Sequence, residues 1–136
     1  MPVDFIKQPQ GLGTPLGNYS HVSIASGAEI VTVAGQVGID HVGELAGDGS
    51  LTAQTRQAFH NVATALKSAG LGMRDIFKTT TYLVGGDNIP EFMEARTAIF
   101  KELLGDGQFP PNTLLVVARL VEERLAVEVE AFAIRG

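Results

Sequence analysis

The last quarter of the chain, residues 109–136, constrains the fold most strongly. It contains two apolar, strand-like runs, and the second run carries two carboxylates, Glu128 and Glu130, among Leu125, Val127, Val129 and Phe132. Carboxylates in such surroundings are costly to bury unless they are paired or hydrogen-bonded. Because side chains alternate along a strand, Glu128 and Glu130 share one face. The run therefore predicts a strand with an apolar face and a second face that requires polar partners or a subunit contact.

The length and composition predict one α+β domain spanning residues 1–136. The chain is 45% hydrophobic, which is sufficient for a core at this size. It contains no cysteine, so disulfides, thiol nucleophiles and Cys-ligated metals are excluded. Its three histidines show no ligand spacing, and we expect no metal site. The net charge of −5 disfavours a general affinity for nucleic acid.

The amino-terminal residues MPVDFIKQPQ lack the pattern of a secretory signal, and no apolar run approaches the ~20 residues of a membrane span. We expect a cytoplasmic protein without membrane association.

The hydrophobic patterns predict the element order β, β, β, α, β, α, β, β. The helices have recognisable ends: Ser50 or Thr52 caps the first, which runs to about Ala69, and Asn88 with Glu91 forms a capping box for the second, which runs to about Leu104. The strands are expected at Phe5–Ile6, as a hairpin over 22–33, at 76–84, and as a C-terminal hairpin that turns near 122–123. This order predicts an α+β fold, a sheet with both helices on one face.

Arg96 has an unusual place on the second helix. It falls inside the apolar arc of the helical wheel, which is marked by Phe92, Ile99 and Leu103. A guanidinium there must extend to solvent, meet a carboxylate such as Glu128 or Glu130, or face a ligand, because a buried unpaired charge is costly. The sequence leaves these alternatives open.

Other candidate residues have weaker signals. Tyr19, beside a Gly-rich loop, could donate a hydrogen bond over a site or simply pack as an aromatic. The glycines of residues 35–38 could bring backbone N–H groups near an anion or could only form a turn. One of the two carboxylates, Glu128 or Glu130, could act as an acid or base or position a water molecule, or both could be structural.

Several motifs together resemble the RidA/YjgF family of reactive-intermediate deaminases. They follow in order along nearly the whole chain: Gly17-Asn18-Tyr19, Val33-Ala34-Gly35-Gln36, TRQAFHNVATALKSAGL, Lys78-Thr79-Thr80, Phe109-Pro110, Val117-Ala118-Arg119-Leu120 and Val127-Glu128-Val129-Glu130-Ala131. The resemblance implies a chorismate mutase-like fold with a six-stranded mixed sheet. It also implies a homotrimer with a central barrel and ligand clefts between subunits. Active members hydrolyse imines or enamines to a 2-oxo acid and ammonia without a cofactor.

The resemblance also implies roles for individual residues. Tyr19 matches the tyrosine of the cleft, Gly35 a backbone group of the cleft, and Glu128 the acid that positions the attacking water. Asn112, followed by Thr113 in the expected pocket, stands where deaminating members have a carboxylate-binding arginine. An amide cannot form the bidentate, charge-assisted clamp of arginine.

The amide at Asn112 and the unusual position of Arg96 lead to one hypothesis and two alternatives. The hypothesis is that the cation has moved to Arg96, so that the pocket still binds a small carboxylate, carbonyl, imine or enamine compound and hydrolyses an imine or enamine, with Glu128 orienting water. A non-catalytic trimer that binds a metabolite is the alternative, and an endoribonuclease, which some relatives are reported to be, is a distant third. In the expected C-terminal hairpin Asn112 and Glu128 lie ~13–16 Å apart, so a site that uses both would borrow one from a neighbouring subunit.

Overall fold

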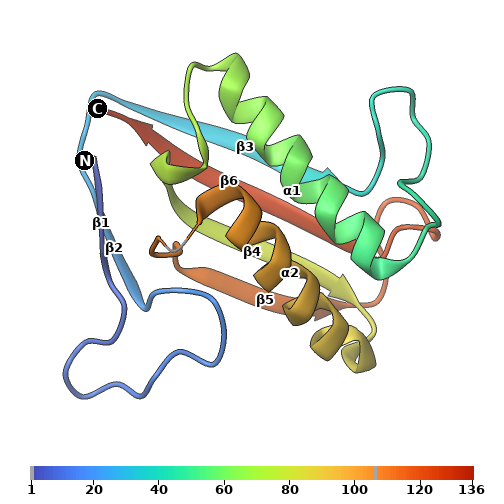
Figure 1. The fold of residues 1–136 in the computed structure, drawn as a ribbon, viewed down its shortest axis with the longest axis horizontal. Coiled ribbons are helices and arrows are strands. Elements are labelled where there is room, and N and C mark those ends of the chain that lie inside the picture. The colour runs from blue at the N-terminus through green and yellow to red at the C-terminus, as the bar shows by residue number, and fades with distance from the viewer. Residues whose placement is uncertain (1, 106) are drawn as a thin grey trace.

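A computed structural model describes residues 2–105 and 107–136 and contains the eight predicted elements in the predicted order (Figure 1). They are β1 (Val3–Ile6), β2 (Val22–Ala25), β3 (Glu29–Val37), α1 (Leu51–Ser68), β4 (Ile76–Val84), α2 (Ile89–Leu104), β5 (Asn112–Val117) and β6 (Val127–Arg135). Short 3-10 turns at Met73–Asp75 and Gly86–Asn88 precede β4 and α2.

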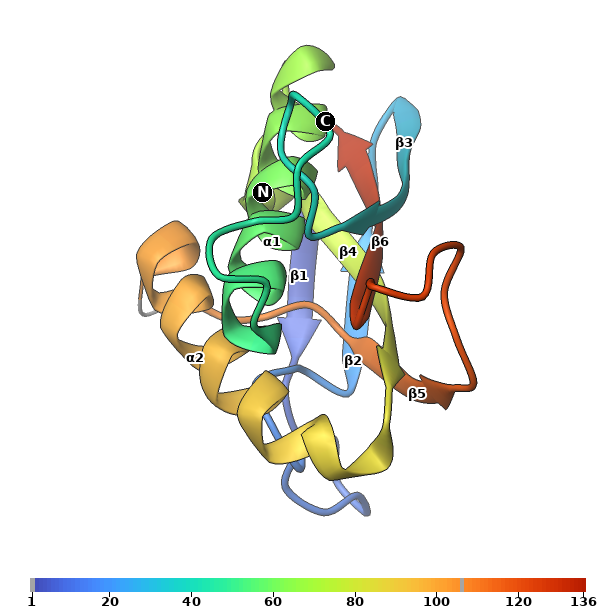
Figure 2. The same cartoon turned by 90° about the vertical axis from the view of Figure 1, so that its right-hand side faces the viewer.

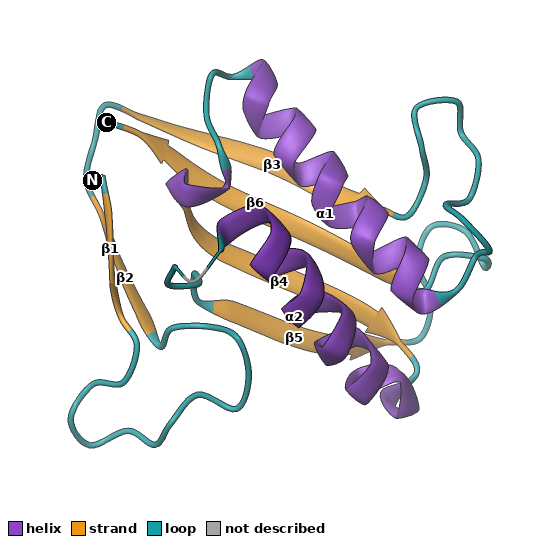
Figure 3. Cartoon of the chain, viewed as in Figure 1, coloured by secondary structure: helices purple, strands orange, loops and turns teal. Residues whose placement is uncertain are grey.

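The strands form two sheets, which corrects the expected single six-stranded sheet. The larger sheet is mixed and has the order β3-β6-β4-β5, whereas β1 and β2 form a separate antiparallel pair at its side (Figure 3). The strand β5 runs parallel to β4, and β6 runs antiparallel to both of its neighbours, β3 and β4.

Both predicted hairpins are wrong, because the two strands of each expected hairpin pair with other strands instead of with each other. β2 pairs with β1, whereas β3 pairs with β6, and the chain crosses between the sheets at Gly27. A side chain at Gly27 would lie 2.2 Å from the carbonyl oxygen of Arg135, so the crossing requires glycine. At the other end, β4 lies between β5 and β6, because α2 serves as the crossover that parallel strands require.

The helices cover one face of the larger sheet, as the patterns predicted (Figure 2). The helix α1 begins at Ser50, whose hydroxyl accepts a hydrogen bond from the Ala53 N–H at 3.1 Å. Between the helices, Phe59 and Phe100 meet edge to face with 4.9 Å between ring centroids. No helix in the described ranges is long and apolar enough to cross a membrane.

The expected capping box at the start of α2 does not form. The Asn88 side chain donates to the Val84 carbonyl at 2.9 Å instead of capping the helix. The Glu91 carboxylate accepts from both the N–H and the hydroxyl of Thr52, each at 3.1 Å. Asn88 therefore bonds to the end of the preceding strand, and Glu91 connects the start of α2 to the start of α1, so the local capping motif does not form.

Strand alternation gives the larger sheet two chemically different faces. On β6, the residues under the helices, Val127, Val129 and Ala131, are fully buried, whereas Glu128 and Glu130 are half-buried and point the other way. We call the side under α1 and α2 the helix face and the opposite side the open face. Each candidate residue on the sheet therefore belongs to one face or the other.

Candidate functional site

A cavity of about 270 Å³ lies between α2, β5 and the loop before β2. We call it the Arg96 cavity; it is lined by Leu16, Tyr19, Ile89, Met93, Arg96, Asn112 and Leu114. It lies on the helix face, because Asn112 and Leu114 are the β5 residues that point toward α2. Three of the predicted site residues, Tyr19, Arg96 and Asn112, are thus brought together.

Arg96 is buried without an ionic partner in the described structure. Its side chain is only 2% exposed, and its Nε and Nη1 atoms have no hydrogen-bond partner. The guanidinium lies over the Phe92 ring at 5.2 Å. Burial lowers the pKa of Arg96 to about 10, and the nearby Tyr19 hydroxyl opposes this effect. The side chain stays charged at neutral pH, so its free donors favour an anion in the cavity.

Hydrogen bonds orient Asn112 and Tyr19 as additional donors. The hydroxyls of Thr79 and Thr81 both donate to Asn112 Oδ1 at 2.9 Å, so the amide acceptor is occupied and Nδ2 remains as a donor. The Tyr19 hydroxyl accepts from the Leu16 N–H at 3.1 Å and keeps its own proton to donate. The polar groups of the cavity therefore suit a small carboxylate.

Gly17 permits the loop to close against Arg96. A Cβ at this position would lie 2.5 Å from Met93 Cε and 2.8 Å from Arg96 Nη2. We expect Gly17→Ala to displace the guanidinium and to weaken the binding of 2-oxobutanoate, a simple carboxylate probe, by about tenfold in calorimetry, which corresponds to one charged hydrogen bond.

The matched control for this substitution is Gly13→Ala on the same loop. A Cβ at Gly13 meets nothing within 4 Å, so its affinity should stay at the wild-type value. Equal affinities of both alanine variants would contradict the proposed contact between the loop and Arg96.

Glu128 and Gly35 meet on the open face. The strand β3 has a bulge between Val33 and Gln36, and Gly35 lies within it. A Cβ at Gly35 would lie 2.5 Å from the Glu128 carboxyl carbon, so only glycine lets the carboxylate pack over this backbone. Gly35 and Glu128, which the family resemblance assigns to the cleft, therefore lie against each other on the open face.

Four other polar residues of the open face form two hydrogen-bonded pairs. The Tyr82 hydroxyl donates to Glu130 at 2.9 Å, and this bond raises the pKa of Tyr82, with smaller contributions from burial and Glu128. Lys78 donates to the Thr113 hydroxyl at 2.7 Å. Glu130 thus has a structural partner, whereas the Glu128 side chain makes no hydrogen bond within residues 2–105 and 107–136.

The predicted site residues therefore divide between the two faces of one sheet. Arg96 forms no ion pair with Glu128 or Glu130, which corrects that expectation, because the sheet separates them. Thr113 also lies away from the cavity, since neighbouring residues of a strand point to opposite sides. The spacing argument from a C-terminal hairpin was wrong in its geometry, because Asn112 and Ala131 are both in register with Thr79 of β4.

Sequence reasoning missed part of the lining. Leu16, Ile89, Met93 and Leu114 form the apolar side of the Arg96 cavity. Met93 could have been found, since it lies one helical turn before Arg96. The remaining residues come from a loop, a helix start and a strand, whose proximity no local pattern encodes.

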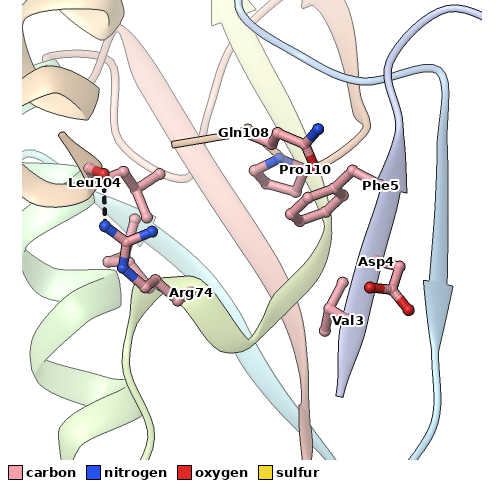
Figure 4. A pocket seen from close by; sticks show the side chains of 8 residues that line it. Val3, Asp4, Phe5, Arg74, Leu104, Gln108 and Pro110 are labelled. Carbon is pink, nitrogen blue, oxygen red and sulfur yellow. Dashed lines mark hydrogen bonds between the residues drawn. The ribbon is translucent and has the colours of Figure 1, made fainter. Parts of the chain in front are cut away.

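A second cavity of about 230 Å³ lies between β1, the turn before β4 and the end of α2 (Figure 4). Its arginine, Arg74, donates to the Leu104 carbonyl at 2.9 Å (Figure 4). Because this cation already has an acceptor, the cavity shows no comparable demand for an anion.

The chain resembles known proteins along nearly its whole length. A family model described as Endoribonuclease L-PSP matches residues 11–135. RutC family protein PH0854 of Pyrococcus horikoshii is 32% identical over 120 residues, which are 88% of each chain. The 2-iminobutanoate/2-iminopropanoate deaminase of Salmonella typhimurium is 33% identical over 107 residues, 78% of this chain and 80% of that protein.

Solved structures agree with the sequence comparison. The Rid family protein YyfB of Yersinia pestis superposes with a TM-score of 0.85 at 26% identity, covering 99% of this chain and 100% of that one. The YjgF gene product of E. coli gives 0.71 at 26% identity, covering 98% and 100%. With the motifs, the fold and the relatives in agreement, the chain belongs to the Endoribonuclease L-PSP family, the RidA/YjgF/RutC group that its motifs resemble.

Proposed function

We propose that this protein binds a small 2-imino or enamine carboxylate and hydrolyses it to the 2-oxo acid and ammonia. The observation that carries the proposal is the buried guanidinium of Arg96, which has free donors in a cavity that also holds Tyr19 and Asn112. Relatives named 2-iminobutanoate/2-iminopropanoate deaminase at 31–33% identity support this reaction class.

The proposed site combines two subunits. Within one chain the sheet lies between Arg96 and Glu128, so a single small ligand cannot contact both. The open face carries exposed apolar side chains beside its carboxylates, with Leu115 46% and Ile30 67% exposed, and such a face suits packing against a second copy. In a homotrimer, Glu128 of one subunit would reach the Arg96 cavity of the next.

The chemistry requires no cofactor. The Glu128 carboxylate accepts a proton from water while the water oxygen forms a bond to the imine carbon. The Glu128 proton then passes to the imine nitrogen, which gives a neutral carbinolamine. Glu128 next takes the hydroxyl proton of the carbinolamine and returns it to the nitrogen as the C–N bond breaks and the C=O bond forms, so that ammonia leaves and the carboxylate is regenerated. Arg96 holds the substrate carboxylate in place throughout, which makes the attack effectively unimolecular.

The test generates 2-iminobutanoate in situ and follows ammonia release, with light scattering of the same sample. We expect acceleration over buffer and a trimer in solution. If the protein is a monomer in solution and still accelerates ammonia release, the shared site is contradicted. If ammonia release is no faster than in buffer, the proposed hydrolysis is contradicted.

A non-catalytic role in metabolite binding is the second candidate. It is favoured by Asn112, which replaces the carboxylate-binding arginine of the deaminating relatives with a neutral amide. In that case 2-oxobutanoate would bind to the Arg96 cavity, whereas 2-iminobutanoate would hydrolyse no faster with the protein than in buffer alone.

A further inference from the structure

We infer that the Arg96 cavity selects monocarboxylates with a branched apolar side chain larger than two carbons, so that the substrates are 2-imino acids of the branched aliphatic class. This inference rests on the proposed function. It concerns which part of the ligand each side of the cavity contacts, and it follows from the lining residues.

One side of the cavity offers hydrogen-bond donors and no carboxylate. Arg96 contributes Nε and Nη1, Asn112 contributes Nδ2, and Tyr19 contributes its hydroxyl proton. A group with two acceptor oxygens and a negative charge satisfies these donors, as a carboxylate does. A neutral ketone would leave the guanidinium uncompensated.

The opposite side of the cavity is hydrocarbon. It is formed by the side chains of Leu16, Ile89, Met93 and Leu114. A second charge or a hydroxyl on the ligand would lose its water there without gaining a hydrogen bond. Aliphatic carbons gain affinity from the same contact, because each buried methylene strengthens binding.

The size of the cavity and the position of Leu16 favour a branched chain. A volume of about 270 Å³ corresponds to roughly nine water molecules at ~30 Å³ each, which exceeds the needs of a two-carbon side chain. Leu16 lines the cavity but is 88% exposed, so a ligand that reaches it would bury apolar surface that is now in water. A branched four-carbon side chain can bury more of this apolar lining than a two-carbon side chain can.

The experiment uses four stable probes, so that binding is measured without hydrolysis. Calorimetry compares 4-methyl-2-oxopentanoate, 2-oxobutanoate, 2-oxoglutarate and the neutral ketone 4-methyl-2-pentanone. We expect the branched acid to bind roughly tenfold more tightly than 2-oxobutanoate, as two further buried carbons predict. The dicarboxylate should bind more weakly than 2-oxobutanoate, and the ketone should show no binding.

The variant Leu16→Ser tests the apolar side of the cavity. Because Leu16 is exposed, we expect the substitution to leave folding unchanged. It should reduce the preference for the branched acid over 2-oxobutanoate. Equal affinities for the two acids, tighter binding of 2-oxoglutarate, or absence of binding by all four probes would overturn the inference. The predicted order of affinities without any ammonia release from the imine would overturn only the hydrolysis.

Discussion

Replacing Arg96 with methionine should raise the free energy of unfolding by about 1–3 kcal/mol and abolish the binding of small carboxylates. Burial lowers the pKa of Arg96 from the ordinary value of an arginine to about 10, and at ~1.36 kcal/mol per unit this shift corresponds to roughly 3 kcal/mol against the charged native state. The contact with the Phe92 ring offsets ~0.5–2 kcal/mol of it.

The sign of this effect follows from the direction of the shift. A base with a lowered native pKa destabilises the fold wherever it is protonated, so the cost is fully present at neutral pH. It fades only as the pH rises above about 10 toward the ordinary pKa of an arginine. Methionine fills a similar volume without charge, as in other replacements of buried ionic groups.

Urea unfolding and calorimetry with 2-oxobutanoate would measure the two effects on the same protein. The control is Arg56→Met on α1, where an exposed arginine pairs with Glu102 at 2.8 Å. Its stability should change by less than about 1 kcal/mol, and its affinity should not change. A destabilised Arg96→Met variant that still binds the probe would contradict the role of Arg96.

The second large effect is expected at Glu128. The substitution Glu128→Gln should lower kcat for imine hydrolysis by roughly 10²- to 10⁴-fold, the usual contribution of a positioned acid–base group. Binding of 2-oxobutanoate should not weaken, because a neutral amide removes a negative charge from the neighbourhood of an anion. Steady-state ammonia release and calorimetry separate the two quantities.

The matched control is Glu130→Gln on the same strand and face. Glu130 accepts a hydrogen bond from Tyr82, and a glutamine oxygen can still accept it, so activity should stay within a few fold of the wild type. A large loss at Glu130 together with wild-type activity of Glu128→Gln would reverse the assignment of the two carboxylates.

Mixed trimers would test whether the site is shared. If Arg96 and Glu128 of different subunits form each site, refolding Arg96→Met and Glu128→Gln together should restore activity to about a quarter of the sites in a random trimer. If both residues of one chain formed the site, the mixture would stay inactive.

Local patterns were sufficient for the elements but not for the pairing of strands. The apolar periodicities of α1 and α2 and the alternation of β6 are encoded within a few residues, so the order of all eight elements was correct. Both hairpins failed because short sequence separation suggested pairing, whereas β6 pairs with β3 and β4, which lie far from it in the chain. The capping box at Asn88 failed for the same reason, since Glu91 found a better partner on another helix.

For the site, the sequence by itself determined the unusual residues: a cation within an apolar helical arc, carboxylates within an apolar strand, and an amide in place of an arginine. Each is visible from local chemistry and from the resemblance to the family. Only the tertiary structure decided their grouping, with Tyr19, Arg96 and Asn112 on the helix face and Gly35 and Glu128 on the open face. The physical reason is that the order of strands in the sheet sets which side chains meet, and long-range burial sets that order.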